Sequence, residues 1–294
     1  MKSGAVAIIG RPNVGKSTLL NALLKEKIAI VSDKPQTTRT RILGVVHHPE
    51  AQIILLDTPG LHKPQHRLNK RMVRTALETM READLIYVLV EATSPPGAAD
   101  CLVIEQVREA VEAGGIQAFL LINKVDLVNK ARVLPLIEAY RTMLDWREVV
   151  PISAQTGLNV DRLLDLTVKV LPEGEALYGE DVVTDQTMRA LAADLVREKI
   201  LHHTRQEVPY SVAVEIERFV EEGKLARIAA SVLVEKESQK AIVIGKHGER
   251  LKAIGTEARI EMERLFGMKV FLELWVKVRE AWREDEQMLT ELGY

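Results

Sequence analysis

Eight residues near the start of the chain constrain its fold more than any other feature. The segment Gly10-Arg11-Pro12-Asn13-Val14-Gly15-Lys16-Ser17 matches the phosphate-loop pattern G-x-x-x-x-G-K-[ST]. It follows an apolar run, Ala5 to Ile9, that predicts a buried strand, and it precedes a predicted helix from about Lys16 to Leu24. Such a loop wraps phosphate oxygens with backbone N–H groups. The predicted phosphate contacts are Gly10, Asn13, Val14, Gly15, Lys16, Ser17 and Thr18.

Apolar runs and helical patterns alternate through the first part of the chain. Further strands are predicted at Ile42 to His47, Ile53 to Leu56, Leu85 to Val90, Ala118 to Ile122 and Val149 to Ile152. Helices are predicted at Leu68 to Met80 and near 98–113, 130–144 and 159–170. Alternation of this kind favours a mostly parallel, doubly wound sheet with helices on both faces. The fold class predicted for this part is therefore α/β.

Polar residues after the next strands predict a Mg²⁺ site beside the phosphate loop. Asp57 ends one predicted strand and begins Asp57-Thr58-Pro59-Gly60, where the Gly60 N–H is expected to reach a γ-phosphate. Ser17 offers a hydroxyl to the metal. Either Thr37 or Thr38 is expected to complete the metal shell, and Thr38 is the preferred candidate. The predicted metal ligands are thus Ser17, Thr38 and Asp57.

Asn123-Lys124-Val125-Asp126 follows another buried strand and predicts the site for a base. The Asp126 carboxylate can accept bonds from N1–H and the 2-amino group of guanine, whereas adenine would leave it unpaired. Lys124 is expected to lay its stem on the base, and Asn123 to bridge the base and the phosphate loop. Ser153-Ala154 follows the next strand, where the Ala154 N–H is expected to meet guanine O6.

The first 171 residues resemble a GTPase domain of the TrmE/Era group, in which Gly-Arg-Pro-Asn-Val-Gly-Lys-Ser and Asp-Thr-Pro-Gly are typical. The resemblance implies GTP hydrolysis at a low intrinsic rate, with Lys16, Thr38, Gly60 and Asn13 as the catalytic residues. Leu61 stands where many small GTPases carry a water-orienting Gln. Members of this group use a bound K⁺, and the resemblance implies Asn13 as its ligand.

A change of character at 172–185 predicts an interdomain linker, because this stretch is acidic and lacks periodicity. Beyond it, residues 186–294 predict a smaller α+β domain in the order helix, strand, strand, helix, helix, strand. The strands are expected at Ser211 to Phe219, Leu225 to Val234 and Phe271 to Val278. Between them lies a G-x-x-G loop, and the predicted RNA contacts are Ile244, Gly245, Lys246, His247, Gly248 and Arg250.

This second domain resembles a type II KH domain, and the pair of domains is similar to the Era-type GTPases. That resemblance implies binding to the 3′ end of 16S rRNA during assembly of the small ribosomal subunit. It also implies peripheral association with the inner face of the cell membrane. We expect a monomer in the cytoplasm, since the chain has one cysteine, Cys101, no transmembrane run and no signal peptide.

The net charge of −2 removes bulk charge as a reason for RNA binding, so a local surface must provide it. Three other functions stay open at this level. They are a P-loop ATPase or kinase, an enzyme that uses GTP for conformational work, and a GTP-gated protein-binding switch whose KH fold does not bind RNA. Three residues receive structural interpretations only: Cys101 as a buried helix residue, Trp275 as packing for the last strand, and Trp282 in a solvated helix end.

Overall fold

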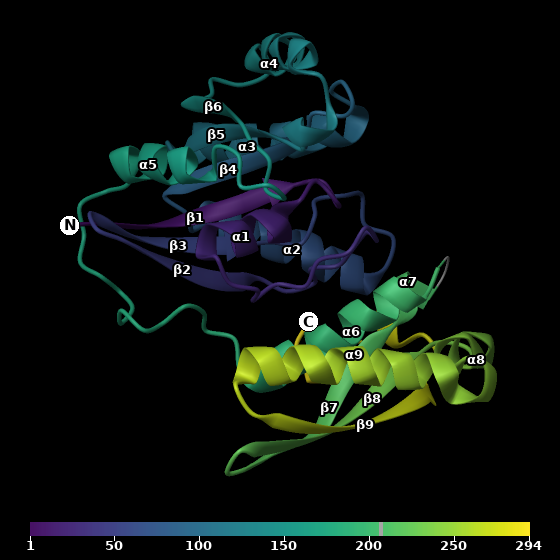
Figure 1. Cartoon of the computed structure of the whole chain (residues 1–294). Helices are drawn as coiled ribbons and strands as arrows, with labels where there is room; N and C mark the ends of the chain where they lie inside the picture. Colours follow the sequence, from purple (N-terminus) through teal and green to yellow (C-terminus); the bar gives the residue numbers. More distant parts are fainter. Residues whose placement is uncertain (206–207) are drawn as a thin grey trace. The chain divides into compact units, whose positions relative to one another are not determined.

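The computed structural model describes residues 1–205 and 208–294, which divide into two compact units (Figure 1). The first unit comprises residues 1–29, 38–65 and 69–185, and the second comprises 30–37, 66–68 and 186–294. The second unit thus takes in two short segments from the first half of the chain.

A six-stranded sheet forms the centre of the first unit. Its strands are β1 (Lys2–Gly10), β2 (Ile42–His48), β3 (Ala51–Asp57), β4 (Leu85–Glu91), β5 (Gln117–Asn123) and β6 (Glu148–Pro151). They lie in the order β2-β3-β1-β4-β5-β6, and only β2 runs antiparallel to its neighbour. The predicted doubly wound, mostly parallel sheet is confirmed.

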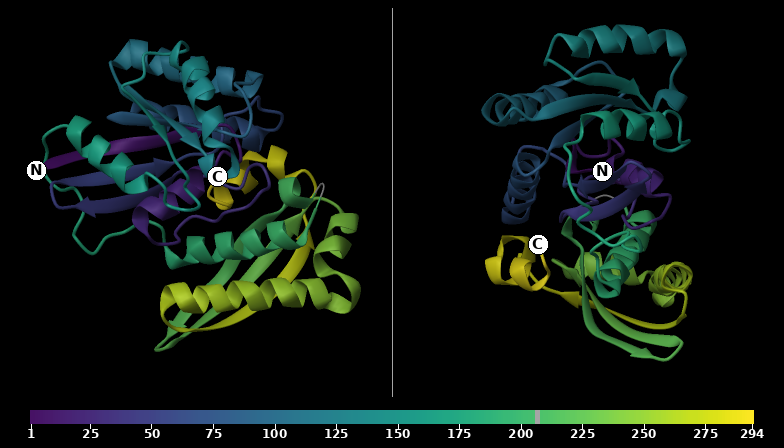
Figure 2. Two further views of the ribbon diagram at one scale, coloured as in Figure 1. Left: turned by 45° about the horizontal axis from the view of Figure 1, so that its top comes forward. Right: turned by 90° about the vertical axis from the view of Figure 1, so that its left-hand side faces the viewer.

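Helices cover both faces of this sheet, as the two views in Figure 2 show. They are α1 (Lys16–Leu24), α2 (Arg67–Arg81), α3 (Ala98–Gly114), α4 (Val133–Arg141) and α5 (Val160–Val170). Successive side chains of a strand point to opposite faces. Accordingly Ile8 of β1 packs in the cluster that contains α1 and α5 residues, while Ile9 packs with residues of α2 and α3. Because both faces are buried, the strands are continuous apolar runs.

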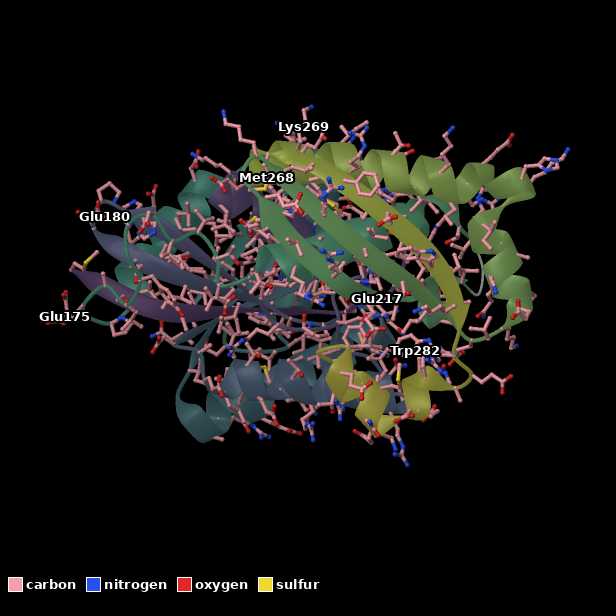
Figure 3. All side chains as sticks on the ribbon, turned by 90° about the horizontal axis from the view of Figure 1, so that it is seen from below. Glu175, Glu180, Glu217, Met268, Lys269 and Trp282 are labelled. Carbon is pink, nitrogen blue, oxygen red and sulfur yellow. The ribbon has the colours of Figure 1, made fainter. Side chains whose placement is uncertain are left out.

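The segment 172–185 belongs with the first unit instead of standing free as a linker. Its residues 182–184 lie along β2, an edge strand whose outer backbone groups would otherwise lack partners. The Val45 N–H donates to the Val183 carbonyl (2.8 Å), and the Thr184 hydroxyl donates to the Leu43 carbonyl (2.6 Å). Glu175 and Glu180 are exposed (Figure 3), which accounts for the acidic composition.

The second unit has a three-stranded sheet with helices packed on it. Its elements are α6 (Met188–His203), α7 (Val208–Ser211), β7 (Ala213–Glu222), β8 (Leu225–Val234), α8 (Glu237–Ile244), α9 (Glu249–Phe266), β9 (Lys269–Val278) and α10 (Glu286–Glu291). Strands β7 and β8 are antiparallel, whereas β8 and β9 are parallel. Residues of α6 and α9 share a core with alternate residues of the sheet. The predicted α+β order is confirmed, with a short additional helix before the first strand.

The structure corrects three of the residue-level interpretations. Trp282 is buried, with 1% of its surface exposed, and its indole N–H donates to the Ser211 carbonyl (2.9 Å); Figure 3 shows it near the C-terminal helix. Trp275 instead lies on the open side of β9 and is 45% exposed. Cys101 is exposed on α3. Nor is any helix in the described part of the chain both long and apolar enough to cross a membrane.

Leu121→Ala should destabilise the first unit by about 2–5 kcal/mol, because this side chain lies fully buried in β5 and its loss leaves a cavity. Urea denaturation measures the change. Leu134→Ala is the matched control in the same unit, where the side chain is 69% exposed and the expected change is within about 0.5 kcal/mol. Equal losses in the two variants would contradict the assignment of the core.

Candidate functional site

The carboxyl ends of four parallel strands bring the predicted motifs together at one edge of the large sheet. The phosphate loop follows β1, Asp57 ends β3, and Asn123 ends β5. Strand β4 lies between β1 and β5, and it ends in Glu91. This edge is where ligands bind in open α/β sheets.

Lys16 begins α1 and lies under the phosphate loop, with 6% of its surface exposed. Its Nζ atom donates to the carbonyl oxygens of Gly10 (3.3 Å) and Arg11 (3.2 Å). Burial lowers the pKa of Lys16 to about 8, although Asp57 acts in the opposite direction. A polyphosphate beside Nζ would favour the ammonium form and offset the cost of burial.

Ser17, Thr38 and Asp57 converge as predicted for the metal ligands. The Ser17 hydroxyl donates to Asp57 Oδ2 (2.7 Å) and lies 2.7 Å from Thr38 Oγ1, which itself lies 3.3 Å from Asp57 Oδ2. Asp57 Oδ1 is buried without a hydrogen-bond partner among the described residues. Burial raises the pKa of Asp57. Thr37 is not part of this cluster, because its hydroxyl donates to the Lys34 carbonyl (2.7 Å).

Gly60 lies directly against the phosphate loop. The Leu61 N–H donates to the Gly10 carbonyl (3.1 Å), and a Cβ on Gly60 would come within 2.7 Å of the Pro12 nitrogen. Leu61 points into the core with Ala7 and Ile9 and is 2% exposed, so it faces away from this edge. His62 Nδ1 lies 2.8 Å from the Gly60 carbonyl oxygen.

The base loop is tied to the phosphate loop by two side chains. Asn123, 2% exposed, donates from Nδ2 to the Val14 carbonyl (2.7 Å), and Lys124 donates from Nζ to the Asn13 carbonyl (2.8 Å). Asn13 and Lys124 both have left-handed backbones, with φ of 66° and 65°. The two loops therefore hold each other in conformations that non-glycine residues rarely adopt.

The residues predicted for the base site differ in how far they are buried and paired within the protein. The Ala154 N–H, expected at guanine O6, donates instead to Asn123 Oδ1 (3.0 Å), because both groups are buried and each needs a partner. Ser153 is fully buried and its hydroxyl accepts from the Thr156 N–H (3.1 Å). Asp126 lies in a 3₁₀ turn and is exposed, so a base could cover its carboxylate on binding.

An ion-pair cluster beside these loops was missed from the sequence. Arg11 Nη2 lies 2.6 Å from Glu91 Oε2 and its Nε lies 3.1 Å from Asp100 Oδ1, while Lys124 Nζ pairs with Glu91 Oε1. Burial raises the pKa of Glu91, but Lys124 and Arg11 outweigh it and leave that pKa below its ordinary value. Glu91 directly follows a buried run, as Asp57 and Asn123 do, and this position in the sequence could have identified it as a residue of the site.

The G-x-x-G loop of the second unit connects α8 to α9 through a 3₁₀ turn at Lys246–Gly248. Gly245, His247 and Gly248 all have positive φ, at 74°, 51° and 78°. Lys246 and His247 are exposed, and Ile244 is half-buried. Arg250, predicted as an RNA contact, donates from Nη1 to the Ile242 carbonyl and thereby braces the end of α8.

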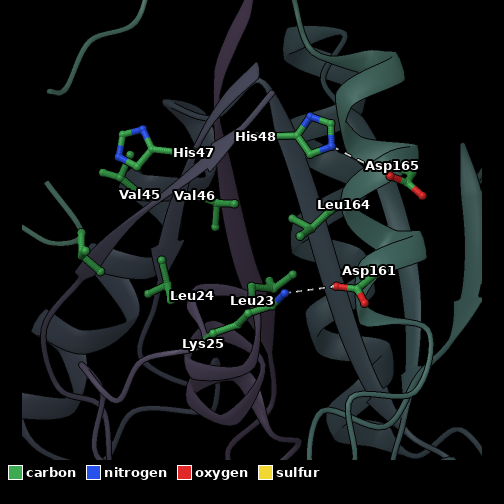
Figure 4. Close-up of a pocket in the computed structure, with 11 residues that line it drawn as sticks. Leu23, Leu24, Lys25, Val45, Val46, His47, His48, Asp161, Leu164 and Asp165 are labelled. Carbon is green, nitrogen blue, oxygen red and sulfur yellow. Dashed lines mark ion pairs between the residues drawn. The ribbon is translucent and has the colours of Figure 1, made fainter. Parts of the chain in front are cut away.

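A surface cavity of about 410 Å³ lies at the other end of α1, away from the phosphate loop (Figure 4). Leu23, Leu24, Val46 and Leu164 provide its apolar part. Two ion pairs, Lys25–Asp161 (3.9 Å) and His48–Asp165 (4.0 Å), lie at its rim. None of the predicted nucleotide-binding residues lines this cavity.

Family models match both units. Residues 5–124 match the family described as 50S ribosome-binding GTPase, and residues 207–283 match the KH domain family. GTPase Era of Geobacter metallireducens is 52% identical to this chain over 295 residues, which cover 100% of this chain and 98% of that protein. GTPase Era of Syntrophus aciditrophicus is 50% identical, with 100% and 95% covered.

Solved structures of Era proteins are similar along the whole chain. A crystal structure of Era in complex with MgGDPNP and nucleotides 1506–1542 of 16S ribosomal RNA aligns with a TM-score of 0.95 at 44% identity, covering 100% of this chain and 99% of that one. Aquifex aeolicus Era, as a Tyr-to-Ala variant bound to GDP·AlF₄⁻, aligns with a TM-score of 0.91 at 43% identity, with the same coverage.

Asp126→Asn should weaken GTP binding by about 10- to 100-fold, because it removes a charged acceptor for the guanine N1–H and 2-amino groups. The variant should gain affinity for xanthosine triphosphate, whose 2-oxo group can accept from the new amide. Competition against a fluorescent GDP analogue measures both changes. Asp145→Asn, at an exposed position of the same unit, is the control. Unchanged GTP affinity in Asp126→Asn would refute the assignment of Asp126 as the residue that binds the guanine base.

Proposed function

The chain belongs to the Era family of GTPases, and on that basis we propose that it uses GTP binding and hydrolysis, with Mg²⁺, to control its hold on the 3′ end of 16S rRNA during small-subunit assembly. The chain is a GTP hydrolase with a KH domain. The proposal adds two points, the RNA that it binds and the control of this binding by GTP. The related Era complex with MgGDPNP and 16S rRNA nucleotides supports them.

One observation supports the nucleotide half most strongly. Oxygens of Ser17, Thr38 and Asp57 meet beside the buried ammonium of Lys16, and Asp57 Oδ1 is without a hydrogen-bond partner among the described residues. Hydroxyl and carboxylate oxygens are the ligands that Mg²⁺ prefers. The residues present therefore fit the ion, which would neutralise phosphate charge when bound.

Hydrolysis in this site has to proceed without a water-orienting side chain at position 61, because Leu61 is buried in the core. Lys16 can neutralise charge on the transferred phosphoryl group, and the Gly60 N–H can hold its oxygens. Asn13 lies on the same loop, with its backbone held by Lys124. We assign Asn13 as the ligand of a potassium ion that supplies further positive charge near the phosphates.

The RNA half of the proposal depends on the G-x-x-G loop. Its positive-φ residues leave the backbone open to close approach, and a Cβ on Gly248 would meet nothing within 4 Å. Lys246 and His247 are exposed beside the start of α9, whose N-terminal N–H groups favour phosphate. These features favour RNA over the protein-binding alternative, because an open backbone next to cationic side chains suits a phosphodiester backbone.

The switch we propose is ordering of the loops at Thr38 and Gly60 by the γ-phosphate, and their release after hydrolysis. The chain is proposed to act as a cytoplasmic monomer. Peripheral association with the membrane stays a prediction from the resemblance.

Asn13→Ala should abolish potassium stimulation of hydrolysis. In the native chain, GTP turnover in KCl should exceed that in NaCl by roughly tenfold or more, since a positive charge near the transferring phosphoryl group stabilises the transition state. Phosphate release at equal ionic strength measures both rates. Asn129→Ala, a cap of the 3₁₀ turn before α4, is the control. Equal turnover of the native chain in the two salts would refute the potassium assignment.

Gly248→Asp should weaken binding of a single-stranded oligonucleotide with the 3′-end sequence of 16S rRNA by about tenfold or more, because it sets a negative charge where the phosphates approach. Filter binding with GTP, with GDP and without nucleotide measures it. Gly223→Asp is a matched control, since Gly223 also has positive φ and open space, in the turn between β7 and β8. Native protein that binds no RNA in any nucleotide state would support the protein-binding switch instead.

A further inference from the structure

Glu91 occupies a central place between the two nucleotide loops although it belongs to none of the predicted motifs. It is the last residue of β4, and its side chain is 13% exposed. One carboxylate oxygen accepts from Arg11 of the phosphate loop at 2.6 Å, and the other pairs with Lys124 of the base loop. A single carboxylate therefore joins the two loops.

Both cationic partners of Glu91 are held in place by further contacts. Asp100, on α3 and 5% exposed, fixes Arg11 through its Nε at 3.1 Å. Lys124 Nζ also donates to the Asn13 carbonyl at 2.8 Å. The chain of contacts runs from α3 through Arg11, Glu91 and Lys124 back to the phosphate loop. Because these groups are mostly withdrawn from water, their attraction is screened less than that of exposed pairs.

Removing the negative charge of Glu91 would change the balance of charges between the two loops. Arg11 would keep its ion pair with Asp100, but Arg11 and Lys124 would face each other without the carboxylate between them, and like charges repel. Lys124 holds a left-handed backbone at φ 65°, which is uncommon for lysine, so the base loop has more favourable conformations to move toward. The expected result is a wider and more variable separation between the loops.

We propose that Glu91 is a positioning residue that sets the distance between the phosphate loop and the base loop, and so slows the release of bound guanine nucleotide. The inference rests on the proposed nucleotide site. A nucleotide touches both loops at once, so it binds best when their separation is fixed beforehand. Glu91 contacts neither the phosphates nor the base in this assignment, and it acts through Arg11 and Lys124.

The test is the dissociation rate of a fluorescent GDP analogue (mant-GDP), chased with excess GDP in a stopped-flow instrument. Glu91→Gln should release mant-GDP about tenfold faster than the native chain or more, because preorganisation of the site is lost. The KM for GTP should rise, while kcat at saturating GTP stays within about twofold, because the groups at the γ-phosphate are untouched. A purely structural role would not separate KM from kcat in this way.

The matched control is Glu105→Gln on α3, where the side chain is 60% exposed and pairs with Arg108. It should release mant-GDP at the native rate. Glu91→Asp keeps the charge and should restore part of the slow release. Adding Arg11→Gln to Glu91→Gln should accelerate release little further, because Arg11 acts through the same carboxylate.

Release from Glu91→Gln within about twofold of the native rate would overturn the inference, since a fixed loop separation predicts a larger change. If Glu91→Gln fails to fold, Arg11→Gln decides the matter, and a native release rate in that variant would overturn the inference equally. Failure of the native chain to bind mant-GDP would instead refute the proposed function. The two failures are therefore distinguishable, since the first leaves native binding intact.

Discussion

The buried side-chain amide of Asn123 is the interaction on which the nucleotide site depends. Its Nδ2 donates to the Val14 carbonyl and its Oδ1 accepts from the Ala154 N–H, so one side chain joins the loops that follow β1, β5 and β6. The side chain is 2% exposed, and an unpaired polar group there would cost about 1–3 kcal/mol. The three loops are therefore held in fixed positions relative to one another. Lys124 and Asp126 follow in the chain and take their positions from it.

The charged forms of two buried residues in this preformed site are disfavoured until a ligand binds. Burial lowers the pKa of Lys16 and raises the pKa of Asp57, so the protein alone disfavours the charged form of each. A nucleotide polyphosphate supplies the anion that Lys16 lacks, and a divalent cation supplies the charge that Asp57 lacks. Because such a ligand binds the folded site and not the unfolded chain, binding stabilises the first unit by mass action. The same groups thus account for nucleotide affinity and for a stability that depends on nucleotide concentration.

The sequence predicts this fold well where one local rule suffices. Apolar runs located β1, β3 and β5, and the rule that parallel strands end at one edge placed Ser17, Asp57 and Asn123 together. Properties that depend on distant partners were missed. Glu91 acquires its role only from Arg11 and Lys124, which are 80 and 33 residues away. Trp282 is buried, and its indole N–H donates to the carbonyl of Ser211, which is 71 residues away. Residues 182–184 pair with the edge strand β2, and no local pattern indicates this contact.

Both ligand-binding loops contain residues with positive φ and are held by a nearby side chain. In the first unit, Asn13 and Lys124 have positive φ; the Lys124 side chain pairs with Glu91 and donates to the Asn13 carbonyl. In the second, the G-x-x-G loop has three residues with positive φ, and Arg250 braces it through the Ile242 carbonyl. A Cβ on Gly245 would come 2.7 Å from the Arg250 Cβ, so close packing at this corner requires glycine there. Arg250 therefore supports the shape of the loop, while its neighbours Lys246 and His247 are exposed to solvent.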